Sequence, residues 1–168
     1  DEMIAARDLV TVATAPLELR LGSAEDGQSE PYPHLTYPPL AMGVFEQPAV
    51  ILPIAPGSKF PTDDFTHEAG VLALLAHEGR PGHEAYFEAL LEKGVSLLRA
   101  RYGYSIPSVE GWAFYAEELS YPDLPLSAQF VVLQMRLWSF ARMFLDPEVH
   151  FGQTSREGAL KILVDQIG

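Results

Sequence analysis

The sequence predicts a mainly helical domain with a small β element near its N-terminal side. Apolar residues recur at helical spacing through most of residues 62–168, whereas residues 1–61 hold short alternating or apolar runs separated by proline-rich loops. A chain of 168 residues with 48% hydrophobic and 20% charged residues is long enough for one domain with its own core. We therefore predict a single domain with a strand- and loop-rich part (1–61) and a helical part (62–168).

The N-terminal part is predicted to contain a short helix and two strands. Residues 1–15 carry a few apolar side chains among alanines, which favours a short helix. Residues 17–21 alternate apolar and charged side chains, the period of a half-buried strand. The apolar run at 49–54 predicts a second strand, either buried or at an edge, and Pro53 favours the edge because it cannot donate to a neighbouring strand. The tyrosines and prolines of 32–39 could line a groove, but we interpret them as a rigid structural loop.

Five helices are predicted for the rest of the chain, each from apolar residues at helical spacing. They cover residues 62–78, 82–102, 109–119, 127–145 and 154–167. The first is predicted to begin at a threonine followed by two aspartates, and the last at a capping box, Thr154-Ser155-Arg156-Glu157. The 127–145 segment is apolar nearly all round, so we expect it in the centre of the core.

Composition and charge exclude several classes of function. A net charge of −12 argues against nucleic acid and anionic membrane as partners, because both are bound through basic patches. No apolar run approaches the roughly 18 residues that span a bilayer. The chain has no cysteine, which excludes disulfides and thiolate metal ligands. The sequence leaves the cellular compartment and the oligomeric state open.

The stretch that points to chemistry is His77-Glu78-Gly79-Arg80-Pro81-Gly82-His83. Imidazoles and carboxylates are ligands that suit zinc. On a straight helix, residues i and i+6 diverge by about 120°, so His77 and His83 can chelate one ion only if the helix breaks between them. Pro81 and Gly82 favour such a break, because proline lacks a backbone donor and glycine tolerates unusual dihedral angles. We therefore expect the first helix to end near Gly79 and the chain to turn so that His83 faces back.

A catalytic zinc ion usually has three protein ligands, so a third ligand is needed. The best candidate is Glu110, an acid near the start of the mostly apolar 109–119 helix. Glu117 lies on the same helix face, where we expect it to orient a histidine or form a salt bridge. Glu78 is adjacent to His77 and diverges from it by roughly 100°, so it is better placed to accept a proton from a water than to bind the same ion.

At this point the sequence resembles a known family. The segments His77-Glu78-Gly79-Arg80-Pro81-Gly82-His83 and Glu110-Gly111-Trp112-Ala113-Phe114-Tyr115-Ala116-Glu117 resemble the patterns H-E-x-x-P-G-H and E-G-W-A-x-Y-A-E of the bacterial family catalogued as domain of unknown function 885. A third segment, Arg142 to His150 with Asp146 between them, is similar to its R-x-x-x-D-x-x-x-H pattern. The resemblance is clear from about residue 76 to residue 168.

The resemblance implies a helical zinc metallopeptidase with a glutamate third ligand. It implies that His77, His83 and Glu110 hold one Zn²⁺ ion, that Glu78 is the general base, and that His150, with Asp146 nearby, helps to stabilise the tetrahedral intermediate. It also implies that this chain is a piece of a longer protein, since family members extend on both sides. This interpretation agrees with the missing initiator methionine.

One residue departs from the family pattern: Glu84 stands where a second histidine is common. We expect this acid to alter substrate preference or to add to the negative charge of the site.

Structural alternatives exist for each candidate. The alternative for His77, Glu78 and His83 is a set of incidental polar residues at the end of a surface helix. The alternative for Glu110 is an acid near a helix start that interacts with the helix dipole. The second H-E pair, His67-Glu68, is interpreted as structural because no partner histidine follows at a chelating distance. Three cations, Arg80, Lys59 and Arg99, could bind a terminal carboxylate, and nothing in the sequence selects among them.

The sequence thus predicts a zinc-dependent hydrolase acting on a peptide or another amide. The alternatives are a non-catalytic metal-binding structural or regulatory domain, and a hydrolase that is inactive without its missing segments.

Overall fold

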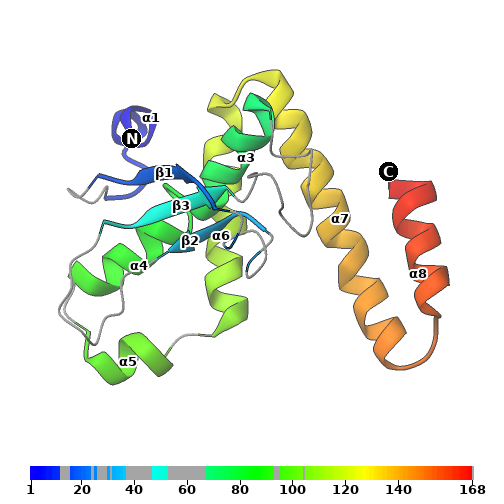
Figure 1. Cartoon of the computed structure of the whole chain (residues 1–168). Coiled ribbons are helices and arrows are strands. Elements are labelled where there is room, and N and C mark those ends of the chain that lie inside the picture. Colours follow the sequence, from blue (N-terminus) through cyan, green and yellow to red (C-terminus); the bar gives the residue numbers. More distant parts are fainter. Residues whose placement is uncertain are drawn as a thin grey trace.

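The computed structural model describes residues 1–11, 16–23, 25, 30, 32–36, 47–52, 67–92, 95–103 and 105–167. These residues form a mainly helical structure with a small sheet near the N-terminal side, which confirms the predicted fold class (Figure 1). No helix in the described part of the chain combines the length and hydropathy that crossing a membrane requires.

The sheet has three strands in the order β1-β3-β2, with β1 (Glu18–Leu21), β2 (His34–Thr36) and β3 (Ala49–Leu52). Strand β3 is buried along its whole length and pairs in parallel with β1 and antiparallel with β2. Of the two positions predicted for this strand, the buried one is confirmed and the edge position is wrong, because both of its sides are hydrogen-bonded; Pro53 lies outside the described residues. Strand β1 was expected to be half-buried, but it is exposed throughout. Strand β2 falls inside the segment predicted as a loop.

The described helices differ from the prediction mainly at their ends. They are α1 (Glu2–Arg7), α3 (Glu68–Glu78), α4 (His83–Glu92), α5 (Leu97–Tyr102), α6 (Ile106–Ser120), η2 (Tyr121–Asp123), α7 (Leu126–His150), α8 (Arg156–Ile162) and the π-helical η3 (Leu163–Ile167). The predicted 82–102 helix is two helices, because the Ser96 hydroxyl accepts the backbone N–H of Arg99 and caps a new start. The predicted start of the first helix at residue 62 lies outside the described residues.

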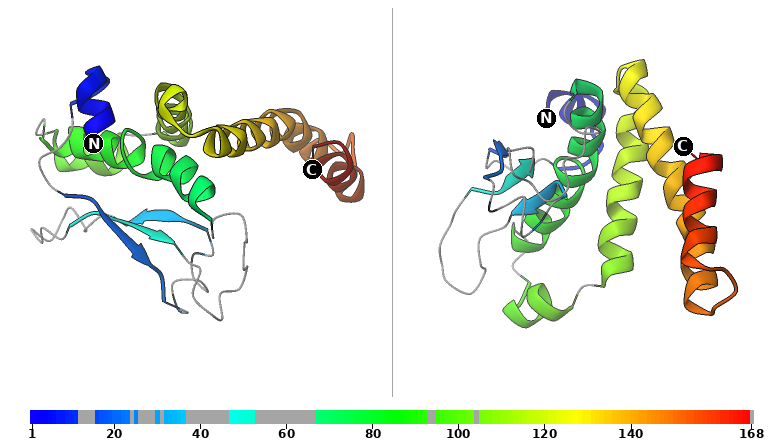
Figure 2. Two further views of the ribbon diagram at one scale, coloured as in Figure 1. Left: turned by 90° about the horizontal axis from the view of Figure 1, so that it is seen from above. Right: turned by 45° about the vertical axis from the view of Figure 1, so that its right-hand side comes forward.

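Helix α3 carries His77 and packs against α6 and α7, while α4 packs against α6 (Figure 2). Small residues permit this close approach: Ala73 and Ala76 on α3 and Ala113 and Ala116 on α6 are all buried. In the view from above, α3 and α4 follow one another along one face of the sheet, and α7 extends away from it (Figure 2). Helices α3 and α6, which carry His77 and Glu110, are thus held side by side by their own core.

Helix α7 was predicted to lie in the centre of the core, and this prediction is wrong for most of its length. Only Ala128, Val132 and Leu145 are buried on this helix. One face, with large apolar residues three or four positions apart, is exposed: Leu126, Phe130, Leu133, Leu137, Phe140 and Phe144. The opposite face packs on α3, so α7 forms an outer wall of the described structure.

Candidate metal centre

A tight turn between α3 and α4 brings the two histidines together. Helix α3 ends at Glu78, and α4 begins at His83. A Cβ atom on Gly82 would lie 1.8 Å from the carbonyl oxygen of His77, so only glycine allows the turn to close this far. The two imidazole rings meet edge to face with centroids 4.8 Å apart. The predicted break between the histidines is therefore confirmed.

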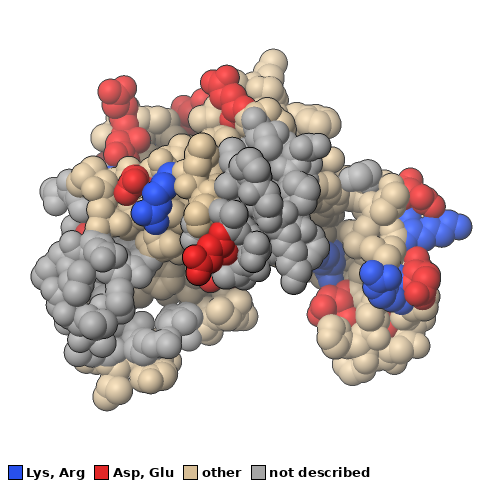
Figure 3. Space-filling view, viewed as in Figure 1, with Lys and Arg blue, Asp and Glu red and all other residues tan. Residues whose placement is uncertain are grey.

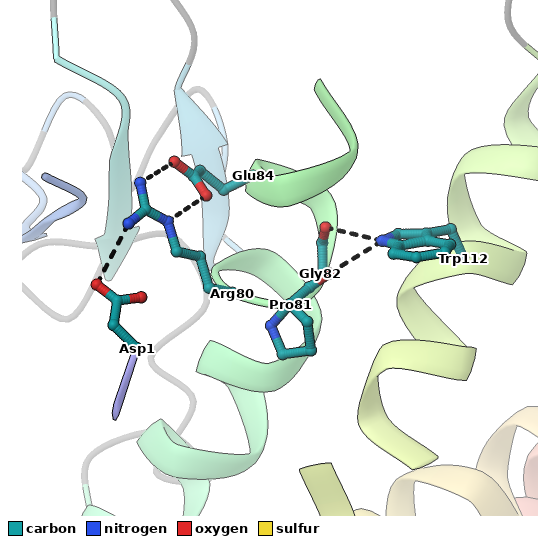
Figure 4. A network of polar contacts seen from close by, with 6 residues as sticks. All are labelled: Asp1, Arg80, Pro81, Gly82, Glu84 and Trp112. Atoms are coloured by element: carbon teal, nitrogen blue, oxygen red, sulfur yellow. Dashed lines mark hydrogen bonds and ion pairs between the residues drawn. The ribbon is translucent and has the colours of Figure 1, made fainter. Parts of the chain in front are cut away.

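The turn is also tied to the helix that carries the third candidate. The indole N–H of Trp112 donates to the carbonyl oxygens of Pro81 and Gly82, at 3.0 and 3.1 Å (Figure 4). Since Trp112 lies two residues after Glu110, this shared hydrogen bond fixes the start of α6 against the turn. This role of Trp112 was not predicted, because an indole in an apolar helix gives no sign of a hydrogen bond to a distant backbone carbonyl.

On another side of the turn, Arg80 and Glu84 form a buried ion pair. The Nε and Nη2 atoms of Arg80 donate to the two carboxylate oxygens of Glu84, each at 2.6 Å, and Asp1 accepts from Nη1 at 3.2 Å (Figure 4). Glu84 does not line the cavity that His77, Glu78 and Glu110 line, and its charge is compensated by Arg80. The expectation that Glu84 adds charge to the site is therefore wrong. Arg80 is no longer a candidate for binding a substrate carboxylate, since its side chain is only 5% exposed.

The three predicted ligands converge. One Glu110 oxygen lies 3.5 Å from Nε2 of His77, and the other lies 3.7 Å from Nε2 of His83. One ligand atom from each residue can be chosen so that all three lie within 4.8 Å of one another. A tetrahedral zinc site with bonds of about 2.1 Å separates its ligand atoms by roughly 3.4 Å. The nitrogen and oxygen donors could therefore hold a metal ion, with ligand atoms somewhat further apart than in a closed tetrahedral zinc site.

Glu117 orients His77, which is the first of the two roles that the sequence predicts for this glutamate. Its Oε1 atom accepts a hydrogen bond from Nδ1 of His77 at 2.6 Å, and its side chain is 1% exposed. With the proton fixed on Nδ1, the Nε2 lone pair of His77 points toward Glu110. Burial acts to lower the pKa of His77, but the hydrogen bond and charge of Glu117, with the charges of Glu78 and Glu110, raise this pKa above its ordinary value. The surroundings of His77 thus favour a positive charge.

His83 is held in the form that a metal ligand needs. Burial, followed by the charge of His77, lowers the pKa of His83 below its ordinary value, against the charge of Glu110. A neutral imidazole has a lone pair free for a metal ion. Its Nδ1 atom is buried and has no hydrogen-bond partner among the residues that the structure describes.

Glu78 lies beside the three candidates without joining them. It lines the same cavity as His77 and Glu110. Burial raises the pKa of Glu78, and the charge of Glu110 adds to this, while His77, His34 and the backbone N–H of Leu35 act against it. The net result is a carboxylate that accepts a proton more readily than an ordinary one. The contribution of β2, through Leu35, was not predicted.

The cavity at this site has a volume of about 680 Å³ and extends from α3 and α6 to α7 and η3. Tyr32 and Pro33 line it, so the interpretation of their segment as purely structural is wrong for these two residues. Trp138, Ser139 and Arg142 of α7 also line it and were not predicted as site residues. The signal that could have found the last two is their spacing, since they are polar residues three positions apart on an apolar helix.

Asp146 and His150 lie apart from the three ligand candidates. Both side chains are 73% exposed, and Nδ1 of His150 lies 2.8 Å from the backbone oxygen of Asp146 and 3.4 Å from its carboxylate. They line a smaller cavity of about 440 Å³, which shares Arg142 and Leu163 with the larger one. The role of His150 in catalysis remains a prediction, and the arrangement of the described residues gives it no support.

The remaining candidates do not line the cavity or lie outside the described residues. His67 caps α3, because its Nδ1 accepts the backbone N–H of Gly70 at 3.1 Å, which confirms its structural interpretation. Arg99 lies on α5 and does not line the cavity. Lys59 lies outside the described residues.

Fold and site together define a mainly helical protein with a candidate metal centre of two histidines and a glutamate. The chain belongs to the family described as "Bacterial protein of unknown function (DUF885)", whose family model matches residues 1–168. The match thus extends over the whole chain, including the residues before about 76, where the motifs described above are absent. No curated protein and no solved structure matches the chain.

Proposed function

We propose that this protein is a zinc-dependent hydrolase that cleaves an amide bond, in the first instance a peptide bond. The observation that carries the proposal is the convergence of His77, His83 and Glu110 in a region bordered by a cavity of about 680 Å³. Structural zinc sites are usually closed by four protein ligands, whereas catalytic sites have three and leave a position open. Three candidate ligands beside a cavity therefore favour hydrolysis over the alternative of a non-catalytic metal-binding domain.

Zinc bound by these residues would polarise a substrate carbonyl and lower the pKa of a water. Glu78 accepts one proton as the water oxygen bonds to the carbonyl carbon. Glu78 then returns this proton to the nitrogen as the C–N bond breaks, so that the products are an acid and an amine. The raised pKa of Glu78 suits the first step, because a more basic carboxylate takes up the proton more readily. Glu117 keeps its hydrogen bond to Nδ1 of His77 throughout and holds that ring in place.

The experiment that tests this proposal substitutes Glu78→Gln and measures zinc content and peptide hydrolysis on the same preparation. We expect zinc to remain bound while turnover of a fluorogenic peptide mixture falls by at least about 100-fold, the usual contribution of a general base. The matched control is Glu118→Gln, because Glu118 is exposed and pairs with Arg136 rather than with the site. Retained turnover in Glu78→Gln would exclude Glu78 as the base. Zinc binding without hydrolysis of any peptide by the unchanged protein would favour the non-catalytic alternative.

A further inference from the structure

The cavity beside the candidate metal centre has an uneven distribution of charge. Its charged lining residues are Glu78, Glu110 and Glu117 on the side of α3 and α6, and Arg142 on the side of α7. Figure 3 shows acidic side chains at scattered points of the visible face, whereas most of the visible basic side chains lie over α7 and α8, next to acidic ones. An anionic group of a substrate would be repelled by the three acids and attracted to the α7 side.

Arg142 has the properties of a residue that binds a carboxylate. Its guanidinium group donates to the Ser139 hydroxyl at 3.3 Å, and no carboxylate of the described residues forms an ion pair with it. It is exposed and lines both the large cavity and the adjoining smaller one. A guanidinium group can donate two parallel hydrogen bonds to one carboxylate, which makes arginine the usual partner for this group.

The wall of the cavity near Arg142 is largely apolar. Met135 and Trp138 line it on α7, with Phe114 on α6 and Val164 on η3. From Met135 to Arg142 the helix advances about 10 Å, which equals two or three residues of an extended peptide. These side chains suit an aromatic or large aliphatic group next to the carboxylate.

From these observations we infer that Arg142 binds the terminal carboxylate of the substrate. The substrate class is then a short peptide with a free C-terminus and a large apolar side chain beside it. This inference rests on the proposed function, because it names the substrate of the same site. Arg142 is a specificity-determining residue in this account, and it takes no part in the chemical step.

The test compares N-acetyl-L-phenylalanine with its amide as ligands of the metal-free protein, by fluorescence titration of the tryptophans. Metal-free protein is used because a carboxylate could otherwise bind to zinc. We expect the acid to bind at least about tenfold more tightly than the amide, as charge-assisted hydrogen bonds usually allow. Arg142→Gln should abolish this preference and Arg142→Lys should restore part of it. The control Arg156→Gln should not change it, because Arg156 is exposed on α8 and lines neither cavity.

Two outcomes would overturn the inference: equal affinity of the unchanged protein for the acid and the amide, or an unchanged preference in a folded Arg142→Gln variant. In the zinc-loaded protein, Arg142→Gln should raise KM for a peptide acid at least about tenfold with little change in kcat. Equal hydrolysis of peptides with and without a free terminal carboxylate would refute the role of Arg142 and leave the proposed function intact. A preference that depends on Arg142, in a protein that hydrolyses no peptide, would refute the proposed function alone.

Discussion

The hydrogen bond between Glu117 and His77 offers a sensitive test of the metal centre. Glu117→Gln keeps the size of the side chain and removes its charge. The lost carboxylate accepts from Nδ1 of His77 at 2.6 Å and is almost fully buried, so water cannot replace it easily. Removal of such a partner usually lowers metal affinity by 10–100-fold, or about 1.4–2.8 kcal/mol. Competition with a zinc-chelating dye at constant pH measures this change.

The neighbouring acid provides the control for this prediction. Glu118→Gln removes the same charge from the same helix, but Glu118 is exposed and pairs with Arg136. We expect the zinc affinity of Glu118→Gln to match that of the unchanged protein within a factor of about two, because exposed charges at a distance are screened. Equal affinities of the two variants would refute the reasoning that Glu117 supports the metal site through His77.

Three further predictions follow from the same geometry. Zinc affinity should fall as the pH drops through the raised pKa of His77, so the fall should begin at a higher pH than an ordinary histidine would give, and in Glu117→Gln it should move to lower pH. Dye competition at a series of pH values measures both curves, and coinciding curves would contradict this prediction. Gly82→Ala should lower zinc affinity more than tenfold, because the added Cβ would overlap the carbonyl oxygen of His77. Gly111→Ala, with open space around the added Cβ, should keep its zinc affinity. Similar zinc affinities of the two variants would contradict this prediction. Glu84→Gln should lower the free energy of unfolding in urea by about 1–3 kcal/mol, because the buried arginine loses two charge-assisted hydrogen bonds while its contact with Asp1 remains, and a loss under about 0.5 kcal/mol would count against this ion pair.

The sequence was sufficient to predict the parts of the site that depend on local spacing. A proline and a glycine between two histidines require a break in the helix, and the structure has that break between α3 and α4. Glu110 was predicted because a carboxylate on an apolar helix needs a partner, and it meets both histidines. The orientation of His77 by Glu117 followed from their chemistry in the same way.

The parts that were missed depend on contacts between distant segments. The position of β3 in the centre of the sheet required β2, whose three residues are too few to show a periodic pattern. The exposed face of α7 was predicted as core, because periodicity reports which residues are apolar but not whether another element covers them.

Local competition between capping residues also shifted helix ends by a few positions. Helix α6 begins at Ile106 rather than at residue 109, with Ser105 at the N-cap position but without a side-chain capping hydrogen bond, and α8 is capped by Ser155, whose hydroxyl accepts from the backbone N–H of Gly158, rather than by Thr154. Neighbouring hydroxyl residues have similar capping strength, so spacing alone does not choose among them.

The central claim is that His77, His83 and Glu110 together bind one metal ion, and zinc content tests it most directly. The purified protein, incubated with zinc and then desalted, should retain about one ion per chain, as a three-ligand site requires. His83→Ala should retain little, while His150→Ala, which alters an exposed histidine outside the large cavity, should retain as much as the unchanged protein. Absence of zinc from the unchanged protein, or equal zinc in His83→Ala, would contradict the account.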